Sequence, residues 1–254
     1  MKKTFIYIMA AVAAIAAVSC NKIENEQAST VRTVTAGFDQ ETRTSLSGNS
    51  VSWEIGDVIK VMNEAGGSES HTIVDSDLNN GKVTFTTTLT GQLYAIYGGT
   101  DASVVEGEVS FTIPSSQSGA FKDANICVAK LDANNHFAFK NATAVLHFVN
   151  CDAEFSNTYI TGQGKPATLS AINITTLDSV TSSFSPTFSV QSSGDALGIA
   201  ISETLSSECY FAVSSGECKF TVTIKNNKGS KTSVEKTKSL VRNMIYTIDV
   251  KNCF

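Results

Sequence analysis

Short stretches in which apolar and polar residues alternate, each followed by a turn signal, constrain the fold of this chain most. Within residues 82–88, Val83, Phe85 and Thr87 fall on one side of an extended chain, which is the period of two expected of a half-buried strand. Asn79-Asn80-Gly81, directly upstream, is a hairpin signal. Turn signals recur about every ten residues, and no stretch of the mature chain has the i, i+3, i+4, i+7 apolar spacing of a helix. The pattern predicts an all-β fold of the sandwich or barrel type.

Composition supports this prediction and excludes one class of partner. Hydrophobic residues make up 42% of the chain and charged residues 17%, which is typical of a globular protein rather than a disordered one. Thr, Ser, Gly, Val and Asn are plentiful, and they favour strands and turns over helices. The net charge of −5 provides no basic field for nucleic acid, so we expect no nucleic-acid partner.

The N-terminus has the features of a bacterial lipoprotein leader. Met1-Lys2-Lys3 is a basic start, Thr4–Val18 is apolar, and Cys20 directly follows small residues. The apolar run is too short for an ordinary spanning helix, so we predict a cleaved signal peptide at residues 1–19. Cys20 would then carry a diacylglycerol with acyl chains such as palmitate, which anchor a protein firmly to a membrane. The alternative is an ordinary signal peptide cut near Ala17.

The residues after Cys20 predict a flexible tether. Asn21–Thr30 is polar and has no periodicity, so residues 20–30 are expected to link the lipid anchor to the folded part. The first strand candidate, Val31–Phe38, follows the tether.

A strand, a tight turn and a second strand are predicted within Thr42–Met62. Val51, Trp53 and Ile55 point one way on an extended chain, and Gly56-Asp57 breaks the run with a turn signal. Val58–Met62 then restarts it. The alternation places Trp53, the only tryptophan of the chain, in the core rather than on a sugar-binding surface.

These residues also carry a resemblance to a known family. Thr42-Arg43-Thr44 is followed, after a polar loop, by the pattern x-V-x-W-x-x-G-D-x-I-x-V, which ends at Val61. This order resembles the N-terminal part of the Bacteroidetes fimbrillin-like lipoproteins, relatives of the major and minor fimbrilins. The similarity continues through Leu93–Tyr97 and Arg242–Ile248, and so spans nearly the whole mature chain. Lys22, Glu24 and Glu26 look like the acidic signal that exports such lipoproteins to the outer face of the outer membrane; a merely solvated linker is the alternative.

The resemblance implies a fold of two tandem transthyretin-like Greek-key β-sandwich domains. We place an N-terminal domain at residues 31–145 and a C-terminal domain at residues 146–254. The domain border could also lie at Lys140-Asn141 or within Asn150–Asn157. Asp178-Ser179-Val180 looks like the Bacteroidetes O-glycosylation tripeptide, which would require an exposed Ser179.

The resemblance also implies a surface-anchored pilus component or adhesin that assembles by donor-strand insertion. In pilus-forming members an arginine-specific protease removes the first strand, and a strand of a neighbouring subunit fills the groove. Here Val31–Phe38 would be the removable strand, with Arg43 as the first candidate for the cut site and Arg32 as the second. The expected partners are the outer membrane, other pilus subunits and host or bacterial surface ligands, at the cell surface or in a fimbria.

One departure from the family favours a tip, accessory or anchor position over the stalk. In stalk subunits the C-terminal part supplies donor strands, whereas here only Lys251–Phe254 follows the strand candidate Tyr246–Val250. The alternative from another class is a non-polymerising glycan- or protein-binding surface lipoprotein.

No residue constellation predicts catalysis, a cofactor or a metal. His71, His136 and His147 sit alone on strand candidates, without a nucleophile motif or an acid at a suggestive interval. There is no C-x-x-C and no Cys/His cluster with zinc spacing. Cys209 and Cys218 could face each other across a hairpin, but buried free thiols are the favoured interpretation of the mature cysteines. We therefore predict that the chain is not an enzyme.

Overall fold

The computed structural model describes residues 31–39, 51–152, 167–176, 179–182, 186–191, 197–200 and 207–254. The leader, Cys20 and the tether lie outside these residues, as does Arg43. Val31–Phe254 forms one compact unit.

The regular secondary structure of the described residues is almost entirely β-strand, which confirms the all-β prediction. They contain two short 3₁₀ turns, η1 (Asp75–Asp77) and η2 (Val250–Cys253), and no α-helix. No helix in this part of the chain is long and apolar enough to span a membrane. The strands are β1 (Arg32–Phe38), β2 (Val58–Asn63), β3 (Ser68–Thr72), β4 (Leu78–Asn79), β5 (Lys82–Thr87), β6 (Leu93–Tyr97), β7 (Thr100–Val105), β8 (Glu108–Thr112), β9 (Cys127–Lys130), β10 (His136–Asn141), β11 (Ala144–Val149), β12 (Thr168–Thr176), β13 (Ser179–Ser182), β14 (Phe188–Gln191), β15 (Leu197–Ala200), β16 (Glu208–Val213), β17 (Gly216–Asn226), β18 (Gly229–Thr232), β19 (Lys236–Leu240) and β20 (Ile245–Asp249).

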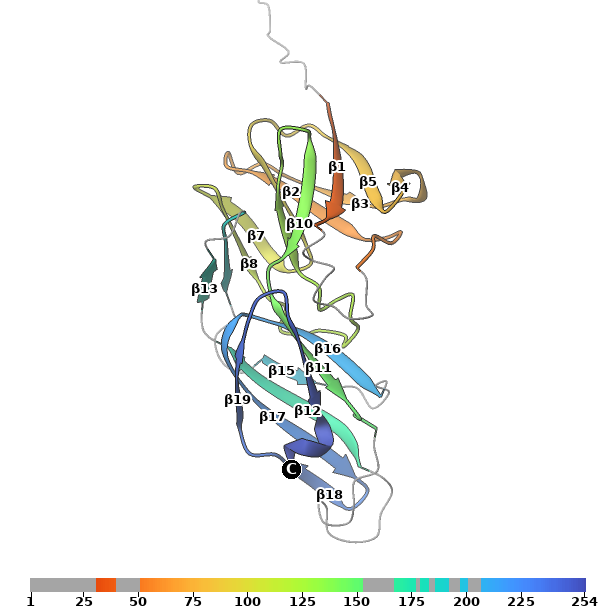
Figure 1. The fold of residues 1–254 in the computed structure, drawn as a ribbon, viewed down its shortest axis with the longest axis vertical. Helices are drawn as coiled ribbons and strands as arrows, with labels where there is room; N and C mark the ends of the chain where they lie inside the picture. Colours follow the sequence, from red (N-terminus) through yellow and green to blue (C-terminus); the bar gives the residue numbers. More distant parts are fainter. Residues whose placement is uncertain are drawn as a thin grey trace, which may run out of the picture. The chain divides into compact units, whose positions relative to one another are not determined.

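The strands form several sheets, and the largest contains the first strand of the unit. Its order is β3-β2-β6-β9-β10-β1-β5-β4, so β1 lies inside the sheet, between β10 and β5 (Figure 1). The other sheets have the orders β16-β11-β20, β15-β12-β17-β18 with β19 also paired to β17, and β13-β14-β8-β7. Most neighbouring strands are antiparallel, but β1 runs parallel to β10 and β20 runs parallel to β11.

Buried apolar side chains form two clusters. The smaller cluster takes its members from residues 34–139 and includes Phe38, Trp53 and Phe139. The larger one takes its members from residues 62–253 and includes Phe111, Phe148 and Phe220. The tandem transthyretin-like arrangement and its border stay predictions; residue 146, where we placed the second domain, lies within β11.

Turns that were visible in the sequence form where they were expected. Asn80 and Gly81 have φ values of 50° and 76° and connect β4 to β5, as the Asn-Asn-Gly signal predicted. In β5 the inward positions are Val83, Phe85 and Thr87. The alternation therefore identified both the strand and its buried face.

Two predicted inward residues are instead exposed, in each case because a turn begins earlier than expected. The strand that the sequence predicts before Gly56 does not form, since residues 51–54 belong to no strand and the chain turns at residues 55–56; Ile55 is 61% exposed. Alternation in the sequence also predicts one strand from Val104 to Ile113 with Val105 inward, but Val105 is 63% exposed. Glu106 and Gly107, with φ values of 50° and 80°, turn the chain between β7 and β8.

Truncation of Phe38 tests how far the smaller cluster depends on β1. Phe38 is 7% exposed, and we expect Phe38→Ala to lower the free energy of unfolding by about 3–5 kcal/mol, because it removes a buried ring and leaves a cavity. Urea unfolding followed by Trp53 fluorescence measures the change. Val31→Ala, at a position that is 64% exposed, is the matched control and should change stability by less than about 0.5 kcal/mol. Equal effects of the two substitutions would contradict the prediction.

Candidate functional site

β1 is hydrogen-bonded along both of its edges. It pairs with β5 from Arg32 opposite Thr87 to Ala36 opposite Val83. On the other side it pairs with β10 from Thr35 opposite His136 to Phe38 opposite Phe139. Removing β1 would therefore leave the facing edges of β5 and β10 without partners, and unpaired edges are a ready template for another strand.

The inner face of β1 is apolar. Val34 and Ala36 are fully buried, and Phe38 is nearly so. The ring of Phe38 stacks on Trp53 with centroids 4.3 Å apart and meets Tyr97 edge-on at 6.2 Å. We call the space that β1 fills, between β5 and β10 and over Trp53, the β1 groove. An extended segment with apolar residues at alternate positions is the kind of ligand that fits it.

Arg32, the second candidate cleavage site, lies in β1. Its guanidinium donates two hydrogen bonds to the Asn135 side-chain oxygen, at 2.9 and 2.5 Å. Because its backbone belongs to the β1–β5 ladder, a protease would have to open the sheet to reach it. Arg43, the first candidate, lies outside the described residues, and both cleavage sites stay predictions.

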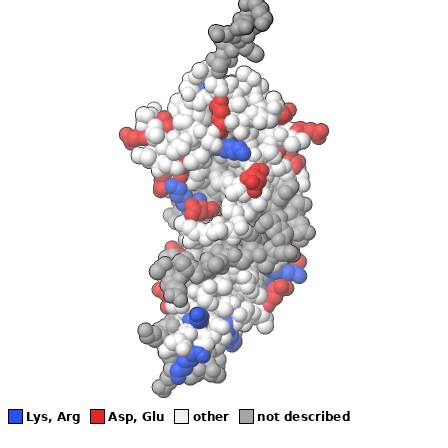
Figure 2. All heavy atoms as spheres, turned by 180° about the vertical axis from the view of Figure 1, so that it is seen from behind, with Lys and Arg blue, Asp and Glu red and all other residues white. Residues whose placement is uncertain are grey.

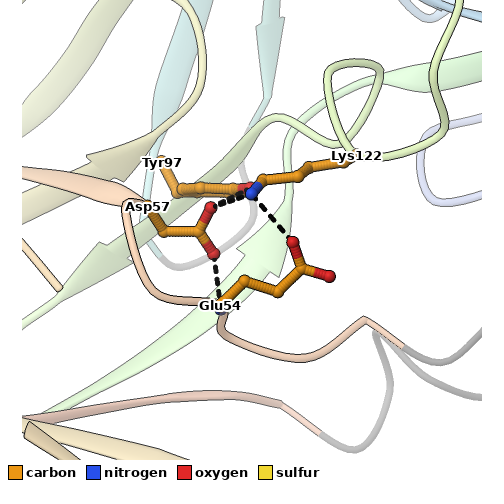
Figure 3. Close-up of polar contacts among 4 residues, drawn as sticks. All are labelled: Glu54, Asp57, Tyr97 and Lys122. Atoms are coloured by element: carbon orange, nitrogen blue, oxygen red, sulfur yellow. Dashed lines mark hydrogen bonds and ion pairs between the residues drawn. The ribbon is translucent and has the colours of Figure 1, made fainter. Parts of the chain in front are cut away.

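The Gly-Asp turn of the W-x-x-G-D motif holds a buried carboxylate, shown in Figure 3. Asp57 is 3% exposed. Its Oδ2 accepts a hydrogen bond from the Glu54 backbone N–H at 2.9 Å, which closes the turn. Its Oδ1 lies 2.7 Å from the Lys122 ammonium and accepts a bond from the Tyr97 hydroxyl at 3.2 Å. Asp57 thus joins the motif to β6 and to the loop that carries Lys122.

The contacts with Asp57 raise the pKa values of Lys122 and Tyr97. Hydrogen bonds to Asp57 and Glu54 raise the pKa of Lys122, with Lys122 Nζ 3.0 Å from Glu54 Oε2. Burial raises the pKa of the Tyr97 phenol, and the neighbouring Asp57 carboxylate adds to the effect. Both groups keep their protons at neutral pH, so the arrangement is a structural network rather than an acid–base pair. One feature of the sequence points to this network: Asp57 closely follows Trp53, which was expected in the core, and an acid that is buried there needs a hydrogen-bond or ion-pair partner.

The C-terminal strand is held inside the larger cluster. β20 pairs with β11 along Ile245–Asp249, and Ile248 together with Val250 and Cys253 of η2 is buried. Lys238 of β19 lies 5.3 Å from the centre of the Tyr246 ring, a contact of the cation–π type. Releasing β20 would therefore expose core residues.

The histidines do not form a catalytic constellation in the described residues. His71 pairs with Asp77 at 2.8 Å and His147 with Glu208 at 2.8 Å, while His136 Nδ1 lies 2.8 Å from the Thr35 hydroxyl. No group of three or more His, Cys, Asp or Glu side chains in this part of the chain could hold a metal ion.

The structure separates the cysteine pair that the sequence suggested. Cys209 lies on β16 and Cys218 on β17, and these strands belong to different sheets. The nearer sulfur is that of Cys151, 3.8 Å from Cys209 Sγ. Each of the five cysteines after Cys20 is a buried free thiol, as the favoured interpretation expected.

Ser179, the serine of the possible glycosylation tripeptide, is the first residue of β13, where it pairs with Gln191 of β14.

Comparisons with known proteins give partial structural likenesses. A solved structure from Bacteroides uniformis, described as a "putative cell adhesion protein", has 14% identity and a TM-score of 0.42, and the match covers 87% of this chain and 93% of the other. A fimbrial assembly protein from Parabacteroides distasonis has 8% identity and a TM-score of 0.42, with coverage of 86% and 90%. A further "putative cell adhesion protein", from Bacteroides fragilis, has 11% identity and a TM-score of 0.41, with coverage of 81% and 82%. No protein-family model and no curated protein matches the chain.

A double-mutant cycle tests the buried ion pair. We expect Lys122→Met to lower the free energy of unfolding by about 1–3 kcal/mol, because it leaves the Asp57 carboxylate buried without its cation. The double variant Asp57→Asn/Lys122→Met should lose less than the sum of the two single variants, since residues in one network are coupled. Urea unfolding measures all three, with Lys228→Met at an exposed turn as the control. Strict additivity would show that Asp57 and Lys122 do not interact.

Alkaline unfolding tests the position of Tyr97. In the unfolded chain a tyrosine loses its proton near pH 10, whereas the raised pKa keeps Tyr97 protonated in the folded state. The unfolded state then binds fewer protons, so stability falls as pH rises above about 10, by up to about 1.4 kcal/mol per pH unit. Tyr97→Phe should flatten this slope. Tyr94, whose pKa burial raises to about 12, should leave a residual slope. Identical slopes for the wild type and Tyr97→Phe would rule out the effect.

Proposed function

We propose that this protein is a fimbrillin-like component of a surface pilus, or an adhesin, that assembles by donor-strand insertion and has no enzymatic activity. It would be anchored in the outer membrane through a lipid on Cys20 and exposed at the cell surface. The observation that carries the proposal is the position of β1 between β5 and β10.

β1 combines the two properties that a replaceable strand needs. It is the first strand of the unit, preceded only by the predicted tether, so its loss interrupts no other described strand. It also lies inside a sheet and covers Trp53. Its loss would therefore leave the facing edges of β5 and β10 unpaired and expose the apolar surface around Trp53. An incoming strand with alternating apolar residues would restore the ladder hydrogen bonds and the burial together.

The distribution of charge favours contacts between copies. Residues 51–152 contain 12 Asp and Glu against 5 Lys, a net charge of −7, whereas residues 207–254 contain 8 Lys and Arg against 4 Asp and Glu, a net charge of +4. In Figure 2 Lys and Arg gather at the lower end, and Asp and Glu predominate farther up. Opposite charges on the two segments attract when the C-terminal segment of one copy meets the N-terminal segment of another.

The contacts of β20 favour a tip, accessory or anchor position over a stalk position. A stalk subunit has to donate a strand as well as accept one. Here the C-terminal strand is paired with β11, and Ile248, Val250 and Cys253 are buried around it. Donating β20 would open the larger cluster, whereas accepting a strand in the β1 groove would not.

A non-polymerising glycan-binding lipoprotein is the less favoured alternative. Sugar-binding surfaces commonly present an exposed aromatic ring, but Trp53 is 6% exposed and packs under Phe38. Among the described residues, the large apolar side chains that are exposed are all aliphatic. The solved structures described above as adhesion and fimbrial assembly proteins have names in keeping with the favoured proposal.

Cleavage by an arginine-specific protease tests the proposal. The chain has three arginines, Arg32, Arg43 and Arg242. Arg32 is in the β1 ladder, and Arg242 donates a hydrogen bond to the Asn141 carbonyl at 2.6 Å. We expect a cut after Arg43, release of β1 and a red shift of Trp53 emission as its ring loses Phe38. When pilus subunits that donate a strand are added, we expect complexes that resist SDS and dissociate on heating.

Two variants sharpen this test. Arg43→Ala should stay uncut and form no complex, while Arg32→Ala should still be cut after residue 43 and bind a donor subunit. A chain that is cut, shows the red shift and still forms no SDS-resistant complex with the donor subunits would disprove donor-strand assembly. A full-length, lipid-bearing monomer in native outer membranes, with no ladder on denaturing gels, would leave the surface lipoprotein as the function.

A further inference from the structure

Two buried cysteines from distant parts of the sequence are in contact. Cys151 Sγ and Cys209 Sγ are 3.8 Å apart, although 58 positions separate the residues in the chain. Cys151 is 3% exposed and Cys209 is fully buried. Both belong to the larger apolar cluster.

Backbone pairing holds the two cysteines together. Cys209 lies opposite Phe148 in the β11–β16 ladder. Cys151 comes just after β11, and its N–H donates to the Ser207 carbonyl at 2.9 Å. The Cys151 carbonyl accepts a hydrogen bond from Leu169 N–H at 3.1 Å. Backbone pairing therefore fixes the positions of both cysteines, and the fold keeps the two residues next to each other.

We propose that Cys151 and Cys209 form a disulfide when the exported chain meets a disulfide-type oxidant. A disulfide bond requires sulfur atoms about 2.05 Å apart, and side-chain rotations can close the gap from van der Waals contact. Exported proteins fold in compartments where disulfides form and persist. The other three thiols donate to oxygen atoms instead: Cys127 to the Asn141 side chain at 2.9 Å, Cys218 to the Lys219 carbonyl at 4.0 Å and Cys253 to the Asp249 carbonyl at 3.7 Å.

The two thiols share a hydrogen bond in which either sulfur can be the donor. Cys151 is 3% exposed, whereas Cys209 is fully buried. A hydrogen bond from Cys209 to the Cys151 thiolate lowers the pKa of Cys151 and raises that of Cys209. Cys151 is therefore the thiol that becomes the attacking thiolate. It attacks one sulfur of the oxidant and releases the other as a thiolate, which leaves a mixed disulfide on Cys151. Cys209 then loses its proton, attacks the Cys151 sulfur and releases the second thiolate. Two protein thiols are oxidised and one oxidant disulfide is reduced to two thiols.

The bond would tie β16 to the turn after β11 and close the segment that contains β12, β13, β14 and β15. Closing a loop of this length restricts the unfolded chain, which stabilises the folded one. Because both sulfurs are buried, we expect the bond to form during folding and to resist reduction afterwards.

Refolding of the full chain in a redox buffer tests the inference. The protein is denatured and reduced, refolded with reduced and oxidised glutathione, alkylated, digested and analysed by mass spectrometry. We expect a linked peptide pair that contains Cys151 and Cys209, with Cys127, Cys218 and Cys253 alkylated. The oxidised protein should melt about 5–10 °C above protein refolded in dithiothreitol.

Serine variants test whether the disulfide joins Cys151 and Cys209 rather than another pair of cysteines. Cys151→Ser and Cys209→Ser should each abolish the linked peptide and the melting shift. Cys218→Ser, the matched control at another buried position, should retain both. The mapping of the wild type does not depend on how well the variants fold. Alkylation of both Cys151 and Cys209 in the wild type after oxidative refolding, or a link from Cys209 to Cys218, would overturn the proposal.

Discussion

The insertion of β1 between β5 and β10 is the constraint on which the N-terminal part of the structure depends. This strand provides ladder hydrogen bonds on both edges and places Phe38 against Trp53, 4.3 Å between ring centres. Backbone pairing and aromatic packing are thus lost or gained together, because one short strand supplies both. Under the proposed assembly, a strand that replaces β1 would therefore have to supply both the ladder hydrogen bonds and the apolar side chain over Trp53.

The hydrogen-bond network of the buried Asp57 carboxylate and the aromatic cluster share one residue, Tyr97. Its ring meets Trp53 edge-on at 5.3 Å, and its hydroxyl donates to Asp57. The loop that carries Lys122 is therefore linked through Asp57 to the floor of the β1 groove. A charged group that is 3% exposed is costly unless it is paired. The pairing with Lys122 satisfies this charge and fixes the Gly-Asp turn that follows Trp53.

Local patterns predicted local structure well and distant pairing poorly. The all-β fold, the hairpin at Asn80-Gly81 and the burial of Trp53 follow from turn chemistry and alternation, which act over a few residues. Ile55 and Val105 are exposed although alternation places them inward, because Ile55 lies in a turn and Val105 directly precedes one. Alternation holds only within a continuous strand. The contacts of Arg32 with Asn135 and of Cys151 with Cys209 join residues 103 and 58 positions apart. Nothing in a single sequence encodes such distances, so the partners of Asp57 and Cys209 required the structure.

The first strand, β1, and the last strand, β20, differ in their strand partners and in the buried residues next to them. This difference determines which core residues each strand would expose if it left its sheet. Both run parallel to a central neighbour, β1 to β10 and β20 to β11. β1 has strand partners on both edges, and it packs on Trp53, which also contacts other residues of the smaller cluster. β20 has a described partner on one edge, and the buried residues of η2 follow it directly in the chain. Release of β20 would withdraw Val250 and Cys253 from the larger cluster, whereas release of β1 would leave both in place. Under the proposed donor-strand assembly, such a chain would accept a strand from a neighbour and keep its own last strand, as a subunit at the end of an assembly or beside it must.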